Sequence, residues 1–458
     1  MRSMYTTIWA FCLVLGTSGV AAGAPPLQPL KISANGRYFM TADGKPFFWL
    51  GDTGWLLFSK LKREEAIQYL DDRKQKGFNV IQTMLLHTTQ VVNAYGDTAL
   101  VNGDVATPNT ITGYWNHVDF IIDAAAERGI YMAMVPVWGS EVKAGHVNRE
   151  QAKQYATFLA NRYKNKTNII WLNGGDLKGS DSMEVWNTLG STLRAQDPNH
   201  LITFHPRGRW SSSTWFHKEP WLDFNMFQSG HRRYDQDTTA GDHHYGEDNW
   251  RYVEVDYSLQ PVKPTLDGEP SYEHIPQGLH DPKEGLWYAS DLRRYAYWSV
   301  FAGGCGFTYG HNAVMQMHRP GDTDGNYGVN QYWYDAISDS GSTQMQYLKK
   351  LMLSKPGYFD RVPDQSLIIG DPGDKYDRLV ATRGKDYAMV YTYTGRNISI
   401  NMDQMKGKKG KLSWYNPRNG QTTSAGKYKT SGIMEFDPPG QPRPGNDWVL
   451  IIEWTSKK

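Results

Sequence analysis

The 458-residue sequence predicts an α/β protein: a (β/α)8 barrel, or TIM barrel, followed by a small all-β sandwich. Two observations predict this architecture. Eight short hydrophobic runs alternate with helical segments over roughly 300 residues, as in a barrel of parallel strands covered by helices. Beyond Pro356 the chain changes to short alternating runs separated by Gly, Pro and Asn, which is typical of a sandwich. We therefore place the barrel in residues 25–360 and the sandwich in residues 361–458.

A hairpin is predicted ahead of the barrel, over Leu30–Thr41, with Asn35-Gly36 at its turn. The eight hydrophobic runs that follow are the predicted barrel strands. Most are apolar on both faces, as a strand packed between helices and a barrel interior must be. They are Phe47–Asp52, Asn79–Met84, Tyr131–Trp138, Asn168–Asn173, Leu201–His205, Phe224–Gln228, Pro264–Asp267 and Gly306–Tyr309.

The segments between these runs have helical periodicity and end at stop signals such as Gly77 and Gly129. The predicted helices are Glu64–Lys76, Val118–Arg128, Lys153–Tyr163, Met183–Leu193 and Leu286–Phe301. The fifth unit is short, because Pro206–Leu222 leaves little room for a full helix. An open doubly wound sheet is the alternative fold. Such a sheet often has a Gly-rich phosphate turn after its first strand, and Gly51-Asp52-Thr53-Gly54 does not match GxGxxG.

Seven short runs predict the strands of the C-terminal sandwich. They are Leu367–Ile369, Arg378–Thr382, Asp386–Thr394, Ile398–Met402, Lys411–Tyr415, Ile433–Phe436 and Trp448–Trp454. No long linker precedes them, so we expect the sandwich to pack on the barrel.

The composition narrows the class of ligand. Lys+Arg 49 against Asp+Glu 47 leaves a formal net charge of +2, and the two signs are interspersed. This balance argues against a nucleic-acid-binding protein and against an acidic disordered tail. The 17 Trp and 28 Tyr suit surfaces that stack on sugar rings while offering a hydrogen bond. We expect an oligo- or polysaccharide partner, and no metal or organic cofactor.

Residues 1–24 are predicted to be a secretory signal peptide. Arg2 supplies the positive start, Ile8–Leu15 is a short apolar run, and Ala22-Gly23-Ala24 is a small-residue exit. The run is shorter than the 20 or so apolar residues that a membrane span needs. Removing the signal leaves Cys305 as the only cysteine, so no internal disulfide is expected. The sequence thus predicts an exported protein, periplasmic, cell-surface or secreted.

Functional groups of a (β/α)8 barrel lie at the carboxyl ends of its strands, so the residues there are the candidates. Nearly every predicted strand is followed by a group that can hydrogen-bond a hydroxyl or stack on a ring. The candidates for substrate binding are Asp52, His87, Trp138, His205, Gln228, His231 and Tyr309. For each of them a purely structural role, such as a helix cap or a buried core residue, is the alternative.

Two carboxylates stand out as catalytic candidates, Asp176 after the fourth strand and Glu269 after the seventh. Glycoside hydrolysis needs one carboxylic acid to protonate the leaving oxygen and one carboxylate to stabilise or trap the oxocarbenium-like centre. The glycines before each residue allow the backbone to turn sharply as it leaves the barrel. Asp267 and Glu273 compete for the role of Glu269.

Other chemistries have less support. Metal-dependent hydrolysis on this fold would place a His-x-His after the first strand, where the sequence has Gly-Asp-Thr-Gly instead. A Ser-His-Asp hydrolase is poorly supported because no GxSxG occurs. The alternative from another class is a non-catalytic carbohydrate-binding or adhesion protein on a barrel scaffold.

Several stretches carry a family resemblance: "DGKPFFWLGDTGWLLF" (Asp43–Phe58), "IIWLNGGD" (Ile169–Asp176), "KPTLDGEPSYE" (Lys263–Glu273) and "WYNPRNGQ" (Trp414–Gln421). They resemble the apiosidase-like catalytic domains of glycoside hydrolase family 140 and the β-domain, of a collagen-binding type, that follows them. The resemblance implies a glycosidase that cleaves the apiose–galacturonic acid linkage of rhamnogalacturonan II in plant cell-wall pectin. It also implies Asp176 as acid/base and Glu269 as nucleophile, with a retaining mechanism favoured.

Overall fold

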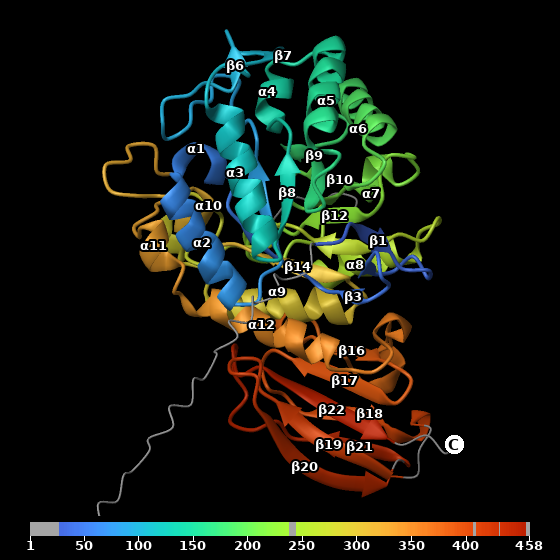
Figure 1. Cartoon of the computed structure of the whole chain (residues 1–458). Helices are drawn as coiled ribbons and strands as arrows, with labels where there is room; N and C mark the ends of the chain where they lie inside the picture. Colours follow the sequence, from blue (N-terminus) through green and yellow to red (C-terminus); the bar gives the residue numbers. More distant parts are fainter. Residues whose placement is uncertain (1–26, 238–243, 406–408, 430, 455–458) are drawn as a thin grey trace, which may run out of the picture.

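The computed structural model describes residues 27–237, 244–405, 409–429 and 431–454. The predicted signal peptide, residues 1–24, lies outside the described residues. Figure 1 shows the barrel above the C-terminal β-domain.

Eight parallel strands form the barrel, each at a position that the sequence predicts. They are β4 (Trp49–Thr53), β5 (Val80–Met84), β8 (Tyr131–Val135), β9 (Ile169–Leu177), β10 (Leu201–Pro206), β12 (Asn225–Gln228), β13 (Thr265–Asp267) and β14 (Gly306–Tyr309). Their order is β10-β9-β8-β5-β4-β14-β13-β12, and β11 (Trp210–Ser211) adds an antiparallel strand to β12. A hydrogen bond from Thr203 Oγ1 to the carbonyl of Phe224 (2.6 Å) joins β10 to the start of β12. The predicted (β/α)8 barrel is therefore confirmed.

Helices cover the outside of the barrel in Figure 1. The longer ones are α2 (Arg63–Gln75), α3 (Tyr114–Glu127), α5 (Arg149–Tyr163), α6 (Met183–Gln196), α8 (Asn249–Ser258), α9 (Ala289–Phe301) and α12 (Ser340–Leu353). The short ones are α1 (Leu57–Lys60), α4 (Gly139–Lys143), α7 (Ser213–Phe216), α10 (Asn312–Met315) and α11 (Trp333–Ala336). As the sequence predicts, the fifth unit holds only the four-residue α7. None of the helices in the described part of the chain is both long and apolar enough to cross a membrane.

The predicted N-terminal hairpin is present and lies under the barrel. β1 (Leu30–Ile32) pairs with β2 (Phe39–Thr41), which pairs with β3 (Pro46–Phe47). The ring of Phe39 packs edge-on against Phe224, with 5.0 Å between the ring centroids, and also contacts Trp49. Because both partners stand at the amino ends of their strands, the hairpin covers that end and leaves the carboxyl ends open. A second hairpin, β6 (Leu100–Val101) with β7 (Asp104–Pro108), follows β5.

The C-terminal domain is a sandwich of a six-stranded and a two-stranded antiparallel sheet. The larger sheet has the order β15 (Val362–Pro363), β16 (Val380–Arg383), β17 (Tyr387–Thr392), β22 (Trp448–Trp454), β19 (Lys409–Tyr415) and β20 (Thr422–Lys429). The smaller one pairs β18 (Ile398–Asn401) with β21 (Ile433–Phe436). The strand predicted at Leu367–Ile369 is reduced to an isolated β-bridge between Ile368 and Ile400. Gln365–Leu367 forms a 3-10 helix instead, and Asp364 caps it by accepting from the N–H of Ser366.

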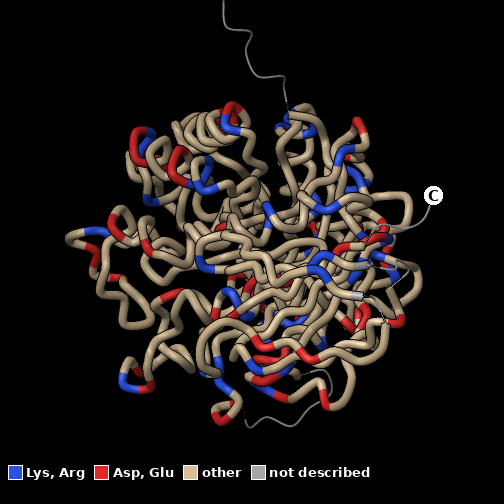
Figure 2. The backbone as a smooth tube through the Cα atoms, turned by 90° about the horizontal axis from the view of Figure 1, so that it is seen from below, with Lys and Arg blue, Asp and Glu red and all other residues tan. Residues whose placement is uncertain are grey.

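Helices α9 and α12 lie between the barrel and the sandwich (Figure 1). Tyr297 of α9 stacks on Tyr391 of β17, with ring centroids 4.8 Å apart and an interplanar angle of 14°. Arg293 of the same helix makes a buried ion pair of 2.8 Å with Asp447. The sandwich thus packs on the barrel, as expected from the absence of a long linker. Seen from below, Lys and Arg are interspersed with Asp and Glu (Figure 2), which agrees with the charge balance of the sequence.

Candidate active site

A pocket of about 510 Å³ opens at the carboxyl ends of the barrel strands. Residues at or beyond the carboxyl end of each of the eight strands line it. They include Trp55, Met84, His87, Trp138, Asp176, Arg207, Arg209, Gln228, His231, Arg232, Glu269, Tyr272, His280, Met315 and Tyr327. Of the predicted substrate-binding residues, His87, Trp138, Gln228 and His231 therefore lie at the pocket, and both predicted catalytic carboxylates do too.

Glu269 stands at the floor of this pocket, two residues beyond β13, and its side chain is largely buried. The preceding Gly268 is required by packing, because a Cβ there would lie 2.6 Å from the side chain of Met226. Its carbonyl accepts a hydrogen bond of 2.8 Å from Gln82 Nε2, which fixes the turn. Neighbouring strands thus hold the backbone that carries the carboxylate.

Two histidines contact the Glu269 carboxylate. His231 Nε2 donates to Oε1 at 3.1 Å. His205 Nε2 lies 3.0 Å from Oε2 as an ion-pair contact, although its N–H is not directed at that oxygen. Oε2 therefore accepts no hydrogen bond from the described residues. Burial opposes ionisation of Glu269, but the two histidines outweigh it and lower its pKa from 4.5 to about 2.

Asp176 projects into the same pocket from the end of β9. It follows two left-handed glycines, Gly174 (φ 93°) and Gly175 (φ 126°), and is itself left-handed (φ 53°). A Cβ on Gly174 would lie 2.6 Å from the carbonyl of His205, so only glycine fits there. The predicted sharp turn is thus present, and Asp176 is an exposed residue that lines the pocket.

Burial by the pocket walls and the negative charge of Glu269 raise the pKa of Asp176 from 3.8 to about 6. Because Asp176 is also exposed to solvent on one side, solvent limits how far burial raises its pKa. Its one hydrogen bond within the described chain is a weak one, from the N–H of Gly208 to Oδ1 at 3.4 Å. The two carboxyl groups therefore have pKa values displaced in opposite directions.

His205 lies between the two carboxylates. Its Nδ1 accepts a hydrogen bond of 3.4 Å from the Asp176 backbone N–H, which assigns the proton to Nε2, the atom facing Glu269. The ring is fully buried and packs against the indole of Trp55, with 5.2 Å between centroids. His205 was predicted to bind substrate, but the structure places it behind Glu269 as a positioning residue.

The prediction that Asp52 and Tyr309 bind substrate is wrong. Asp52 is buried between β4 and α2, where it accepts hydrogen bonds from Tyr69 (2.6 Å) and Arg73 Nε (2.5 Å). Tyr309 is buried on β14 and donates to Glu273 at 2.5 Å. Because Asp52 and Tyr309 are register partners on adjacent strands, both side chains lie on the same face of the sheet, toward the covering helices.

The competing carboxylates after β13 also have structural partners. Asp267 is fully buried and accepts from Ser229 (2.9 Å) and Asn249 (2.8 Å). Glu273 accepts from Tyr309 and from the N–H of Gly341 (3.2 Å). Neither lines the pocket. Glu269 is therefore the carboxylate of this segment that faces the cavity.

Sequence reasoning missed the part of the pocket that comes from the long loop after β14. Asp324, Asn326 and Tyr327 lie there, and Tyr327 has its pKa raised by burial and by the charges of Glu269 and Asp176. This loop returns to the pocket 15 or more residues after the strand end, which is beyond the reach of a search at strand ends. An aromatic residue within a Gly- and Asp-rich loop was the available signal.

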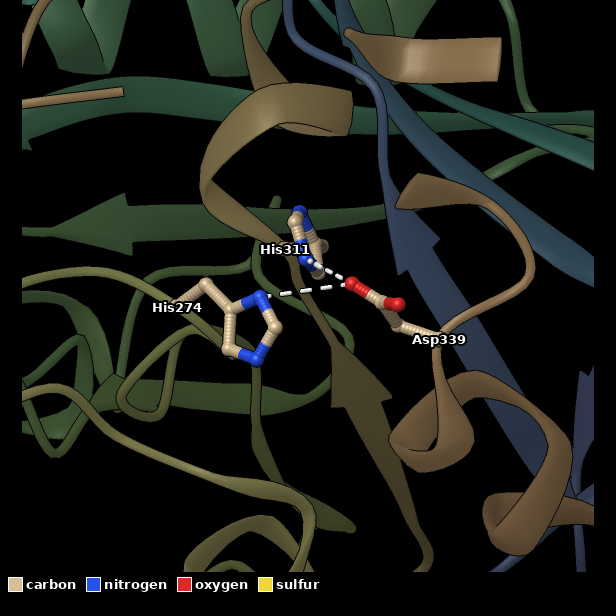
Figure 3. A group of neighbouring side chains, drawn as sticks. All are labelled: His274, His311 and Asp339. Carbon is tan, nitrogen blue, oxygen red and sulfur yellow. Dashed lines mark hydrogen bonds and ion pairs between the residues drawn. The ribbon is translucent and has the colours of Figure 1, made fainter. Parts of the chain in front are cut away.

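His274, His311 and Asp339 form a second histidine–carboxylate cluster (Figure 3), and their ligand atoms lie within 4.8 Å of one another. Asp339 Oδ2 faces His311 Nε2 at 2.9 Å and His274 Nδ1 at 3.3 Å. Nδ1 of His311 accepts from the N–H of Ala313 (3.1 Å), so its proton is on Nε2 and no lone pair faces the centre. The cluster is a hydrogen-bonded junction, and its proton positions do not fit a metal ion.

A pocket that two carboxyl groups line, at the carboxyl ends of a (β/α)8 barrel, has the groups that glycoside hydrolysis needs. The chain belongs to the apiosidase-like family: residues 33–358 match the model of the apiosidase-like catalytic domain. Residues 362–453 match a model named for a collagen-binding domain of a collagenase.

Solved structures agree with the family. One described as a glycoside hydrolase is 49% identical with a TM-score of 0.90, covering 94% of this chain and 98% of its own. Another, a glycoside hydrolase family 5 protein from Bacteroides vulgatus, is 46% identical with a TM-score of 0.90 and covers 94% of each chain. The comparison with curated proteins gave no match. These relatives indicate a glycosidase, whose substrate is a carbohydrate.

Proposed function

We propose that the protein is an exported, retaining glycoside hydrolase that cleaves the apiose–galacturonic acid linkage of rhamnogalacturonan II, as in glycoside hydrolase family 140. One observation supports the catalytic part above all. At one pocket, the pKa of Asp176 is raised to about 6 and that of Glu269 is lowered to about 2. At a pH between these two values Asp176 is protonated and can donate a proton, while Glu269 is an anion. Glycoside hydrolysis needs one carboxyl group in each of these states.

In the first step the Glu269 carboxylate attacks the anomeric carbon. The bond from that carbon to the glycosidic oxygen breaks, and Asp176 transfers its proton to this oxygen as the sugar departs. In the second step Asp176, now ionised, takes a proton from water, whose oxygen displaces Glu269 from the anomeric carbon. The sugar leaves with its original anomeric configuration, and both carboxyl groups return to their starting states.

The indoles of Trp55 and Trp138 and the ring of Tyr272 supply apolar walls next to Glu269. Trp55 Nε1 donates to the hydroxyl of Tyr272 at 3.2 Å, so the two rings brace each other. Such walls suit the faces of a sugar ring, and they exclude water around the reacting carbon. Gln228 and His87 add polar groups for sugar hydroxyls.

Export is part of the proposal and rests on the predicted signal peptide in residues 1–24. Outside that segment the sequence has one cysteine, Cys305. It is fully buried, so no thiol of another molecule can reach it to form a disulfide in an oxidising compartment. Mass spectrometry of the protein from the periplasm and the medium tests this part: we expect a mature chain that starts near Pro25. An intact Met1 in a cytosolic fraction alone contradicts export.

The activity is tested by product analysis on apiose-containing fragments of rhamnogalacturonan II, with NMR of the first-formed anomer. We expect free apiose released with retained configuration, and loss of release in both Asp176→Ala and Glu269→Ala. Release at the wild-type rate by either variant contradicts the assignment of that carboxylate. Binding of the fragments without any cleavage supports the alternative, a non-catalytic carbohydrate-binding protein.

A further inference from the structure

A second cavity, of about 480 Å³, lies between the barrel and the sandwich, where helix α12 faces strands β19 and β22 (Figure 1). We call it the lysine groove. Its lining includes Tyr347, Lys350, Lys355, Lys411, Tyr415 and Asn419. Among the described residues, none lines both this groove and the active-site pocket.

The groove and the active-site pocket lie at opposite ends of the barrel. In the second half of α12, Lys349 donates to the carbonyl of Gly77 at 2.7 Å. Gly77 precedes β5, so this part of α12 lies beside the amino ends of the strands, whereas the pocket opens at their carboxyl ends. A group bound in the groove is therefore remote from Asp176 and Glu269.

Strand alternation determines which side chains form the sandwich wall of the groove. Leu412 and Trp414 of β19 belong to the core of the sandwich, so Lys411, Ser413 and Tyr415 lie on the opposite face of the strand and line the groove. This wall therefore combines a cation with two hydroxyl-bearing side chains.

The turn between β19 and β20, within the "WYNPRNGQ" stretch, holds this wall against α12. The hydroxyl of Tyr415 donates to the carbonyl of Tyr347 at 2.8 Å. A Cβ on Gly420 (φ 71°) would lie 2.6 Å from the ring of Tyr347, so the ring packs directly on this glycine. The two walls are thus fixed to each other, and the groove is a permanent feature of the interface.

The groove carries an excess of positive charge. Lys355 pairs with Glu453 at 2.7 Å, and Glu453 is the one acidic residue among the described residues of the lining. Lys350 donates to the amide oxygen of Gln346 at 2.5 Å. In the part of the chain that the structure describes, neither Lys350 nor Lys411 pairs with a carboxylate, and both are exposed. Their charges are therefore available to an anion from outside.

We propose that the lysine groove is a second carbohydrate site, which binds an anionic polysaccharide chain and tethers the protein to the polymer. Lys350 and Lys411 pair with acidic groups of the chain, while the ring of Tyr347 and the polar groups of Ser413 and Asn419 suit its sugars. These rings and hydroxyls favour a polysaccharide over a polyanion that lacks sugar rings. The inference goes beyond the proposed function and does not depend on it.

Calorimetric titration with polygalacturonate tests the proposal. In Lys350→Gln/Lys411→Gln we expect the Kd to be about 10-fold higher than in the wild type. The charge-retaining Lys350→Arg/Lys411→Arg keeps the Kd within about threefold. The matched control is Lys153→Gln/Lys218→Gln, which removes two exposed lysines of the barrel outside the groove and leaves the Kd unchanged. Melting temperatures show that each variant is folded.

Thr422→Glu adds a negative charge to the groove and should also weaken binding. No binding by the wild type, an unchanged Kd in both groove variants, or an equal loss in the control overturns the inference. Polyglutamate that binds as tightly as polygalacturonate, and is lost in the same variants, overturns the choice of a polysaccharide. The titration measures binding without cleavage, so its failure is distinct from failure of the proposed function.

Discussion

Two clusters in the described part of the chain each bring a carboxylate into contact with two histidines, and we assign catalysis to one of them. Glu269 contacts His205 and His231, and Asp339 contacts His274 and His311. In both clusters burial opposes ionisation, and the histidines hold the carboxyl pKa well below its usual range. The residue types, the contact distances and the direction of the pKa shift are therefore shared.

The clusters differ in where the carboxylate lies. Glu269 lines a cavity that a second carboxyl group, that of Asp176, also lines. Oδ2 of Asp339 also accepts from Gln331 at 3.1 Å, and Asp339 precedes α12 away from the pocket. A histidine–carboxylate contact therefore does not define an active site. What sets the Glu269 cluster apart is the open cavity that its carboxylate shares with Asp176.

The largest expected difference is in the rate of catalysis. Glu269→Gln removes the attacking oxygen anion, and we expect kcat to fall by roughly 1,000-fold or more. Asp339→Asn, the matched change in the other cluster, should leave kcat within about threefold while it lowers the melting temperature. Steady-state kinetics and calorimetry on both variants check this. A large loss of kcat in folded Asp339→Asn breaks the comparison.

The second difference is in the pH profile. His231→Ala removes the hydrogen bond that favours the anion of Glu269, so its pKa rises from about 2. Glu269 is then protonated at higher pH, and the acid limb of kcat/KM moves upward with a loss of about 10-fold near pH 4. His311→Ala, which disturbs the other cluster, should leave the acid limb in place. Equal profiles for wild type and His231→Ala contradict the role given to His231.

A smaller effect concerns the coupling of the two carboxyl groups that we assign to catalysis. Burial is the first cause of the raised pKa of Asp176 and the charge of Glu269 is the second. In Glu269→Gln the pKa of Asp176 should therefore fall below about 6 without reaching its ordinary value. The 13C chemical shift of the Asp176 carboxyl, followed against pH in both proteins, measures this. An unchanged titration means that the two groups do not sense each other.

The smallest expected effect is on stability in the second cluster. Hydrogen bonding to Asp339 raises the pKa of His274 to about 9, above its ordinary value of 6.5. Its stabilising contribution is fully present below pH 6.5 and is lost as the pH rises through 9. His274→Asn should therefore lower the free energy of unfolding by about 1–3 kcal/mol at pH 6 and by little at pH 9.5. Urea titrations at both pH values check this, with His280→Asn as the control, and a pH-independent loss contradicts it.

The sequence predicts the barrel well because its strands are continuous apolar runs that end at polar residues. Phe47–Asp52 and Gly306–Tyr309, for example, agree with β4 and β14 to within two residues. The edge strand β20 was not predicted, because Thr422–Lys429 is largely polar and exposed and has no apolar alternation to detect. The strand predicted at Leu367 fails because an apolar run of three residues does not distinguish a strand from the 3-10 helix that Asp364 caps here.

The same property that reveals barrel strands hides which of their side chains face the pocket. A strand that is apolar on both faces does not show which residues point inward, so Asp52 and Tyr309 were assigned to the wrong face. Asp176 and Glu269 were predicted as the catalytic pair for a different reason. Each lies beyond the regular part of its strand and follows glycine, so its direction depends on the turn and not on strand alternation.

A mechanism-based inhibitor tests most directly whether Glu269 attacks the sugar. An activated aryl 2-deoxy-2-fluoro-apioside should leave a covalent glycosyl group that peptide mass spectrometry locates on Glu269. The Asp339→Asn enzyme should be labelled at the same residue. A label on Asp267 or Glu273, or inversion of configuration in the product of the normal substrate, contradicts the claim.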